Sequence, residues 1–366
     1  MTSHNMTRTF LSFAVLSVVC FVVAAAYVLS RVNSPESINI MLAQSVKNDS
    51  SEEDQTRVTL PTTPYVIFRH TALGQQYGQL GFTSLVTREA ARTLLPFRCE
   101  RVHFAAGHGV CLAANRGMLT TYKAIVFDST LQPLYELPLN GVPSRTRVAP
   151  DGQVAAITVF VNGHSYNTAG FSTQVMIVDL QNGNKLVENL EKFTVLREKE
   201  RLQAADLNFW GVTFTNDSKQ FYVTVGTGGQ TYLAKGNLQT GVVQVLREGI
   251  ECPSLSPDNT RIAFKKRTTS SFGPVTWLLS ILDLRTFSEW PLTETRNVDD
   301  QVEWLDNSQV LYNLPDSMSA AMTNLWVVPA DGQGTPRLFI PQAYSPAVVH
   351  GETRTKFINR TTPLKG

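Results

Sequence analysis

The sequence predicts an all-β fold, a six-bladed β-propeller, and three observations support this prediction. A hairpin with a Pro, Asp or Asn turn recurs along the chain, at intervals of roughly 40 to 50 residues. Each hairpin is followed by two further short apolar runs, which makes four strands per repeat. Incomplete repeats stand at the two ends of the repeat region and together make one complete unit. Four-stranded repeats of this length are typical of propeller blades.

The clearest copy of the hairpin lies at Ile250–Arg267. Its two apolar segments flank Pro257-Asp258-Asn259, where proline presets φ and the Asp or Asn side chain bonds nearby backbone amides. The other copies turn at Gly107, Asp151, Asp217 and Asp306. The five turns are 44, 66, 41 and 48 residues apart, so five complete blades are expected. We interpret the charged run Arg197–Arg201 as a surface insertion that lengthens the longest interval.

The ends of the repeat region predict how the ring closes. Pro64–Phe97 supplies three strands with no first strand, and Ser345–His350 supplies a first strand with nothing after it. We expect these segments to pair, because closing the ring removes the exposed sheet edges that invite aggregation. The propeller is therefore expected to span residues 64–350, with a three-plus-one closure.

The segments outside the propeller predict export. Phe10–Leu29 is an apolar run of 20 residues, and as a helix it is long enough to cross a bilayer core of about 30 Å. We expect an uncleaved transmembrane signal anchor with residues 1–9 in the cytoplasm; the alternative is a signal peptide cleaved after Ala24–Ala26. Either outcome places the propeller outside the cytoplasm. Residues 30–63 are polar and acidic, which predicts a flexible linker, and residues 351–366 form a basic tail.

Three cysteines follow the apolar run. Because an exported chain can form disulfides, we expect a bridge between Cys99 and Cys111, which flank one hairpin. A turn near Gly107 places Cys111 opposite Val102, so this bridge requires a kink at Cys99. Two reduced thiols are the alternative. Cys252 is expected to be free and buried in its strand.

Composition and motifs exclude several classes of protein. A net charge of +2 on 366 residues argues against a nucleic-acid-binding surface. The sequence contains no HExxH, GxSxG or Walker motif and no CxxC spacing, and its six histidines are scattered singly. We therefore expect no metal and no cofactor.

Four segments carry a more specific signal, namely WGVTFTNDSKQFYVT, ECPSLSPDNTRIAFKKR, VDDQVEWLDNSQVLY and LWVVPADG. They resemble segments of TolB-like six-bladed propeller proteins, in particular membrane-anchored versions from actinobacteria-like organisms. The resemblance covers about residues 64–350. It implies the propeller fold, export and a binding or scaffolding role, and it transfers no catalytic residue.

One face of the predicted propeller is the candidate binding surface. In a propeller, the crossovers between blades share a face with the connections between second and third strands. Here those connections are long, polar and aromatic, and such loops gathered on one rim are where function concentrates. The candidate binding residues on this face are Arg145, Arg147, His164, Tyr166, Asp206, Trp210, Lys265, Lys266, Asp299 and Asp300.

Several of these residues also have a purely structural interpretation. Trp210 would then pack between blades, and Asp299 and Asp300 would be neutralised by arginines such as Arg145. Lys265 and Lys266 would lie at a solvated strand end.

The expected function is a membrane-tethered binding scaffold for a protein, a peptide or an envelope polymer, without catalysis of its own. The alternative is a propeller lyase or hydrolase whose acid and base come from different blades, with Asp206, Asp299, Asp300 and His164 as contributors. Distributed sites of this kind leave no linear motif, so a catalytic pair would be recognised by its geometry.

Overall fold

The computed structural model describes residues 17, 18, 22, 60–87, 91–164, 166, 170–268 and 275–350. The chain divides into two compact units, Met1–Arg57 and Val58–Gly366. The predicted anchor at Phe10–Leu29 lies outside the described residues, apart from Ser17, Val18 and Val22, which are helical. The predicted linker at 30–63 lies outside them up to residue 59, as does the basic tail at 351–366. Within the described ranges, no helix has the length and apolarity to cross a membrane.

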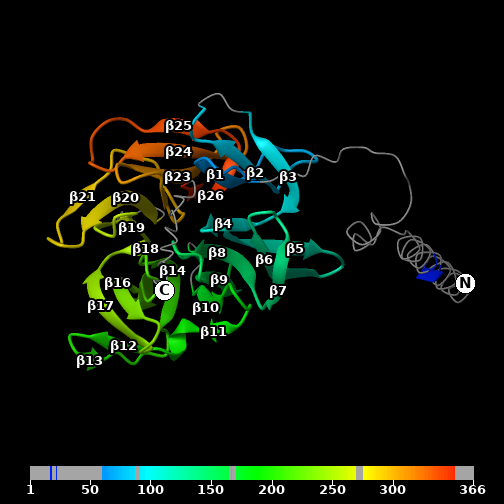
Figure 1. The fold of residues 1–366 in the computed structure, drawn as a ribbon. Coiled ribbons are helices and arrows are strands. Elements are labelled where there is room, and N and C mark those ends of the chain that lie inside the picture. Colours follow the sequence, from blue (N-terminus) through cyan, green and yellow to red (C-terminus); the bar gives the residue numbers. More distant parts are fainter. Residues whose placement is uncertain are drawn as a thin grey trace, which may run out of the picture. The chain divides into compact units, whose positions relative to one another are not determined.

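The described residues form six β-sheets arranged as blades around a ring (Figure 1). The strands of each blade are given from the inner to the outer strand. Blade 1 contains β26 (Ala343–Val349), β1 (Tyr65–His70), β2 (Gln79–Ser84) and β3 (Thr93–Arg98). Blade 2 contains β4 (Arg101–Ala105), β5 (His108–Arg116), β6 (Thr120–Asp128) and β7 (Pro133–Leu139). Blade 3 contains β8 (Val142–Val148), β9 (Val154–Asn162), β10 (Ser172–Asp179) and β11 (Lys185–Val187).

Blade 4 contains β14 (Asn208–Phe214), β15 (Gln220–Thr227), β16 (Gln230–Asn237) and β17 (Val242–Glu248). Blade 5 contains β18 (Glu251–Leu255), β19 (Arg261–Thr268), β20 (Thr276–Asp283) and β21 (Glu289–Pro291). Blade 6 contains β22 (Glu303–Trp304), β23 (Gln309–Pro315), β24 (Thr323–Pro329) and β25 (Arg337–Ile340). The six-bladed prediction is confirmed.

The charged insertion predicted in the longest interval extends blade 4. Strand β12 (Thr194–Arg197) pairs in parallel with β17, and β13 (Glu200–Arg201) pairs with β12. A short 3-10 helix, η2 (Leu190–Lys192), precedes them. Blade 4 is therefore a six-stranded sheet, and the insertion covers its outer edge.

The ring closes as predicted. Strand β26 pairs antiparallel with β1, with Tyr65 opposite Val349 and His70 opposite Ala343. Blade 1 thus takes its inner strand from the C-terminal end of the propeller and its three outer strands from the N-terminal end. This pairing leaves no open edge between the first and last blades, which is the reason for expecting it.

The turns explain why the repeat was visible in the sequence. In each of the hairpins at Asp151, Asp217, Asp258 and Asp306, the carboxylate accepts a hydrogen bond from the backbone N–H two residues later. The same device closes the turns between third and fourth strands, at Asp128, Asp179, Asn237, Asp283 and Asp331. Short side-chain acceptors that bond their own backbone favour turns over continued strand.

The core is divided among the interfaces between neighbouring blades. One cluster packs Ile67 of blade 1 against Phe104 and Phe127 of blade 2, and all three side chains are fully buried or nearly so. Hydrogen bonds also join neighbouring inner strands: His103 Nδ1 accepts from Val148 N–H at 3.1 Å, and Thr213 Oγ1 accepts from Leu255 N–H at 3.1 Å. The apolar strands predicted from the sequence are therefore buried between sheets.

The inner strands are irregular near the crossovers. The pairing register with the second strand shifts in β26, β8, β14 and β18, which are four of the six inner strands in the described chain. Such bulges redirect side chains. In β14 the bulge includes Gly211, with φ of 68°. A Cβ there would stand 2.6 Å from Cys252 Cα, so close approach of β14 and β18 requires glycine.

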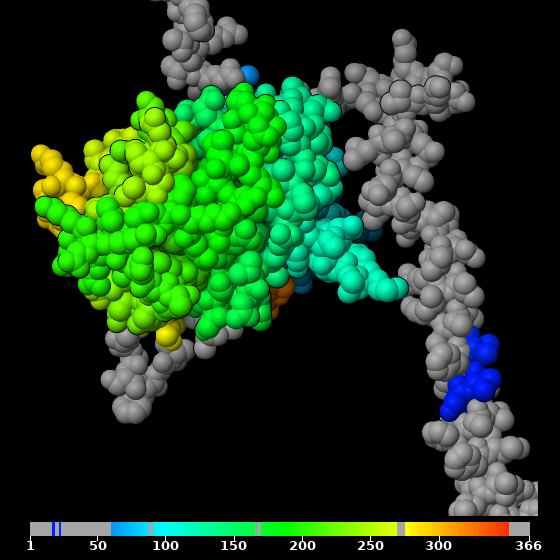
Figure 2. Space-filling model, turned by 90° about the horizontal axis from the view of Figure 1, so that it is seen from below, coloured from blue at the N-terminus to red at the C-terminus, as the bar shows by residue number. Residues whose placement is uncertain are grey.

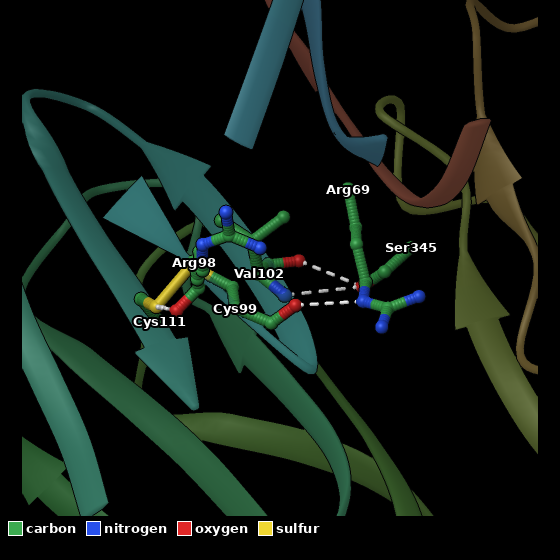
Figure 3. The surroundings of a disulfide bond; sticks show 6 residues. All are labelled: Arg69, Arg98, Cys99, Val102, Cys111 and Ser345. Carbon is green, nitrogen blue, oxygen red and sulfur yellow. Dashed lines mark hydrogen bonds between the residues drawn. A yellow bond between two sulfur atoms is a disulfide. The ribbon is translucent and has the colours of Figure 1, made fainter. Parts of the chain in front are cut away.

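The structure joins Cys99 and Cys111 by a disulfide, with a Cα–Cα distance of 5.4 Å (Figure 3). Strand register places Cys111 opposite Val102, and Cys99 lies in the crossover between β3 and β4, which supplies the required kink. Arg69 Nε donates to the Cys99 carbonyl at 2.8 Å, and Ser345 Oγ accepts from Val102 N–H at 3.1 Å. The bridge therefore lies where the closing blade meets blade 2. Cys252 is the buried free cysteine of the described chain.

Candidate functional site

A pocket of about 470 Å³ opens between blades 3, 4 and 5. Its lining comes from the connection between β9 and β10, the start of β14, the hairpin between β15 and β16, and the ends of β19 and β20. These segments belong to the face predicted for binding, which we call the long-loop face: the crossovers between blades and the connections between second and third strands. The volume is within the range usual for ligand sites.

Aromatic side chains form the wall of the pocket. Tyr166 and Phe171 extend from the connection after β9 and pack on Trp210 of β14, with ring centroids 5.9 and 5.2 Å away. Trp277 of β20 also lines the pocket. A Cβ on Gly226 would stand 2.7 Å from the Trp210 ring, so a side chain there would displace the indole. The aromatic wall is thus built by blades 3, 4 and 5 together.

The buried Tyr166 holds this wall in place. Its hydroxyl lies 2.6 Å from Ser144 Oγ of β8, within hydrogen-bond distance. Burial raises the pKa of Tyr166 to about 12, so the phenol stays neutral at physiological pH. Trp210 is 2% exposed and belongs to the buried cluster of Phe160, Tyr166 and Cys252. Trp210 therefore has both of the roles considered from the sequence: it packs between blades and lines the pocket.

The rim of the pocket is polar. Asp206 accepts hydrogen bonds from Thr227 Oγ1 at 2.6 Å and from Gly228 N–H at 2.7 Å. The Thr227 hydroxyl, followed by that amide, lowers the Asp206 pKa, so Asp206 is an anion that fixes the hairpin of blade 4. Arg267 Nε donates to Glu251 at 3.0 Å and keeps 34% of its side chain exposed. Arg267 is therefore available to an acceptor on a bound ligand.

Lys265 lies between the pocket and the centre of the ring. Its side chain is fully buried, and its ammonium group donates to Asp299 at 2.6 Å. The same nitrogen is 4.5 Å from the centroid of Trp277 and 5.1 Å from that of Tyr166. The expectation that Lys265 is at a solvated strand end is wrong: its side chain points between blades, where a carboxylate and two aromatic faces replace water.

The inner strands carry a second group of charged residues around a cavity of about 30 Å³ in the central channel, which we call the channel cavity. Asp300 forms ion pairs with Arg101, at 3.0 Å, and with Arg145. Glu303 forms an ion pair with Arg147. Arg145 and Asp300 are 5% exposed. The prediction that the acidic pair binds arginines therefore holds for Asp300.

His103 completes this group as a neutral ring. Its Nδ1 accepts a hydrogen bond from Val148 N–H, so the proton is on Nε2, 3.6 Å from Glu303 Oε1. Burial, which outweighs the nearby carboxylate, lowers the pKa of His103. The pKa of Glu303 is lowered to about 2, because the charge of Arg147 and the contacts with His103 outweigh its own burial.

The ten predicted residues thus divide between different places. Tyr166, Asp206 and Trp210 line the pocket, whereas Arg145, Arg147 and Asp300 line the channel cavity. Asp299 and Lys265 form the pair between the two sites. Lys266 forms an ion pair with Glu289 near the outer edge of blade 5, and His164 lines neither site. The ten candidates therefore do not form one cluster, because strand alternation sends neighbouring side chains to different sides.

The sequence reasoning did not single out Arg101, His103, Glu303, Arg267 or Trp277 as site residues. A signal for the first three was present. Arg101 and His103 alternate with apolar residues in the first strand of blade 2, and Arg145 and Arg147 likewise occupy every second position in blade 3. Since inner strands surround the channel, polar residues repeated every second position are expected to face it. Arg267 and Trp277 had no comparable signal.

Six exposed apolar side chains of the described propeller lie on the long-loop face. Met118 and Met318 are 97% and 90% exposed, at the connections between second and third strands of blades 2 and 6. The hairpin of β5 and β6, which carries Met118, stands out from the propeller body in Figure 2. The other members, on blades 1, 2, 3 and 5, are Leu73, Leu119, Val161 and Val275.

The described residues contain no group of three or more His, Cys, Asp or Glu side chains placed to hold a metal ion. Of the four residues proposed for acid–base catalysis, Asp206 alone lines the pocket and Asp300 alone lines the channel cavity.

Comparison with known proteins yields matches only among solved structures: no family model and no curated protein matches the chain. TolB from Acinetobacter baumannii is 18% identical and matches over 78% of this chain with a TM-score of 0.53; the chain spans 66% of that protein's length. A chain of a nidogen/laminin complex is 8% identical, with 78% and 98% of the two chains covered and a TM-score of 0.51.

A putative TolB from Agrobacterium tumefaciens is 14% identical, with 77% and 90% of the two chains covered and a TM-score of 0.48. At these identities structural similarity concerns the fold alone. The chain has a TolB-like six-bladed β-propeller fold.

Proposed function

We propose that this protein is a membrane-tethered, extracytoplasmic binding module whose long-loop face holds a polypeptide segment of a partner, without catalysis of its own. The observation that carries the proposal is the pocket between blades 3, 4 and 5, with the partly exposed Phe171 on its aromatic wall and the partly exposed Arg267 at its rim. A pocket with apolar walls and few polar groups is suited to anchor side chains of a ligand.

Two features favour a polypeptide over an envelope polysaccharide. Sugar rings usually stack on exposed aromatic faces, but Trp210 and Trp277 are only 2% and 1% exposed and offer no such platform. The apolar tips on the same face, Met118 and Met318 among them, suit the apolar side chains of a protein surface. Methionine is adaptable and recurs at binding surfaces that accommodate different partners.

The arrangement of ionisable groups favours binding over catalysis. Asp206 is an anion held by a hydroxyl and an amide, and Asp299 and Asp300 are paired with buried cations. A general base needs a raised pKa and a free path to its proton. The Asp206 pKa is instead lowered, which suits a structural role.

The tether and the location outside the cytoplasm rest on the apolar run Phe10–Leu29 and the polar residues after it. Protease treatment of intact cells should remove the propeller. Complete protection in cells whose wall and outer layers have been made permeable to the protease, with the membrane intact, would contradict this part of the proposal.

The binding proposal is tested by photo-cross-linking of the full-length protein in its own cells. A photoreactive phenylalanine at Gln230, exposed at the pocket, should give a discrete adduct whose mass falls on protease digestion. The same probe at Val86, exposed on the opposite face between β2 and β3, serves as the position control. Equal adducts from both positions would place the binding surface elsewhere, and a glycosidase-sensitive adduct would identify a polysaccharide instead.

A matched pair of substitutions tests the pocket directly. Val275→Lys adds length and charge at the pocket, whereas Val86→Lys makes the same change on the opposite face. Burying an unpaired charge costs about 1–3 kcal/mol or more, so the first variant should lower the adduct yield about tenfold. The second should leave it unchanged. An unaltered yield from folded Val275→Lys would exclude this pocket.

A further inference from the structure

The charges around the channel cavity do not balance. Among the described residues that line it, three arginines, Arg101, Arg145 and Arg147, face two carboxylates, Asp300 and Glu303. The remaining ionisable lining residue is His103, which is neutral because burial lowers its pKa. The lining therefore has one uncompensated positive charge. A net positive charge in a largely buried site is unfavourable unless a counter-ion offsets it.

Asp300 is the point where the imbalance arises. Its carboxylate is shared by Arg101 and Arg145, and it also accepts from Gln301 N–H at 2.8 Å and from the Asn313 side chain at 3.2 Å. Two guanidinium groups thus depend on one carboxylate that is already saturated. The Lys265–Asp299 pair nearby is neutral and does not line the cavity.

The arginines also have unused hydrogen-bond donors. The Nε atoms of Arg145 and Arg147 are buried and have no partner in the described structure. Arg147 uses its terminal nitrogens for Glu303, the Val302 carbonyl at 3.0 Å and Ser254 at 3.4 Å, which leaves Nε unpaired. A buried donor without an acceptor costs about 1–3 kcal/mol. A water molecule could satisfy a donor, but it would not neutralise the charge.

The size of the cavity limits the ligand. Its volume is about 30 Å³, which exceeds the roughly 10–15 Å³ that a cavity needs to hold one water molecule, so the cavity has room for a small ion. A chloride ion is only slightly larger than a water molecule, whereas phosphate and sulfate carry four oxygens around a central atom. The side of the channel toward blades 4 and 5 is spanned by Gln301, which donates to the Pro253 carbonyl at 2.7 Å and the Val212 carbonyl at 3.2 Å.

From the charge, the unpaired donors and the volume together, we propose that the central channel binds one chloride-sized monovalent anion beside Arg101, Arg145 and Arg147. The anion supplies the missing negative charge and lies within the arginine cluster. This site is separate from the pocket between blades 3, 4 and 5, and the proposal does not depend on what that pocket binds.

Bromide provides the direct test, because it replaces chloride and scatters X-rays anomalously. Crystals of the wild-type protein grown without halide and soaked in sodium bromide should show an anomalous peak among the three arginines. Bromide on the protein surface does not count as support. A channel without a peak, in crystals whose surface sites are occupied, would overturn the proposal.

A stability measurement in solution gives an independent test with a matched variant. The full-length protein in detergent is unfolded in urea at constant ionic strength, while gluconate is replaced by chloride. At chloride concentrations ten times the dissociation constant, the ratio of folded to unfolded protein should rise about elevenfold. Arg101→Gln leaves one arginine for each carboxylate and should lose this chloride dependence.

Arg116→Gln is the control, because this arginine is 66% exposed and does not line the cavity. It should respond to chloride as the wild type does. If all three proteins respond equally, or none responds, the channel is not the site. If Arg101→Gln does not fold, the bromide peak in the wild-type crystals decides the question alone.

Discussion

Removing the disulfide tests how much the closing region depends on it. The perturbation is the double variant Cys99→Ala with Cys111→Ala, chosen because both cysteines are buried and alanine adds no polar group. The bridge joins residues 12 positions apart. Closing a loop of this length lowers the entropy of the unfolded chain and contributes about 3 kcal/mol to stability. The free energy of unfolding should fall by that amount.

The assay is equilibrium unfolding in urea, with and without a thiol reductant. The wild type in reductant should fall to the stability of the double variant, and the double variant should not respond to reductant. Cys252→Ala, which removes the buried free thiol, should keep the full response. Amide hydrogen exchange should rise first where blade 1 meets blade 2, since Arg69 bonds the Cys99 carbonyl there. A loss below 1 kcal/mol, or a wild type indifferent to reductant, would refute this reasoning.

Three further predictions follow from the ring. Lowering the pH should destabilise the fold in two stages. The folded pKa of His103 is depressed, so the free energy of unfolding falls as the pH drops below the unfolded value of 6.5 and the ring protonates in the unfolded chain. The ionised Glu303 contributes about 3 kcal/mol to the free energy of unfolding, and this contribution is lost as the pH falls from 4.5 through about 2. Glu303→Gln should remove the second stage from the pH dependence of urea midpoints. Truncation after Gln342, which deletes β26, should abolish cooperative thermal unfolding; a retained sharp transition would contradict the closure. Gly211→Ala should cost at least about 2 kcal/mol more than Gly170→Ala in urea unfolding, because both glycines have φ near 70° but only Gly211 has no room for a Cβ.

The fold was predictable because its determinants are local. Blades 3 to 6 each carry an Asp in the first hairpin that accepts a hydrogen bond from the amide two residues later, as Asp258 does from Thr260 N–H at 3.0 Å. Such a turn needs only three residues of sequence, and its repetition revealed the number of blades. The closure was predictable for a different reason: two incomplete repeats leave open edges, and pairing them is the economical solution.

The site was less predictable because its contacts join distant segments. Asp300 lies beside Arg101 and Arg145, which are far from it in sequence. Only the ring geometry brings them together, and one sequence does not show which charges meet. Lys265 illustrates the difficulty. In the run Lys265-Lys266-Arg267 all three side chains look solvated, yet alternation along β19 sends Lys265 inward to Asp299 and Lys266 outward to Glu289.

The closing strand has a consequence for how the chain reaches its native state. Tyr65 in β1 pairs with Val349 in β26, so two residues from opposite ends of the propeller sequence must meet. Such a contact has nearly the largest sequence separation that the domain allows, and contacts of this kind slow folding. A chain delivered from its N-terminus would hold β1 with an open edge until the last blade had emerged. During that interval the open edge is the part of the protein most prone to pair with another chain, and a chaperone that covers it would have its greatest effect then.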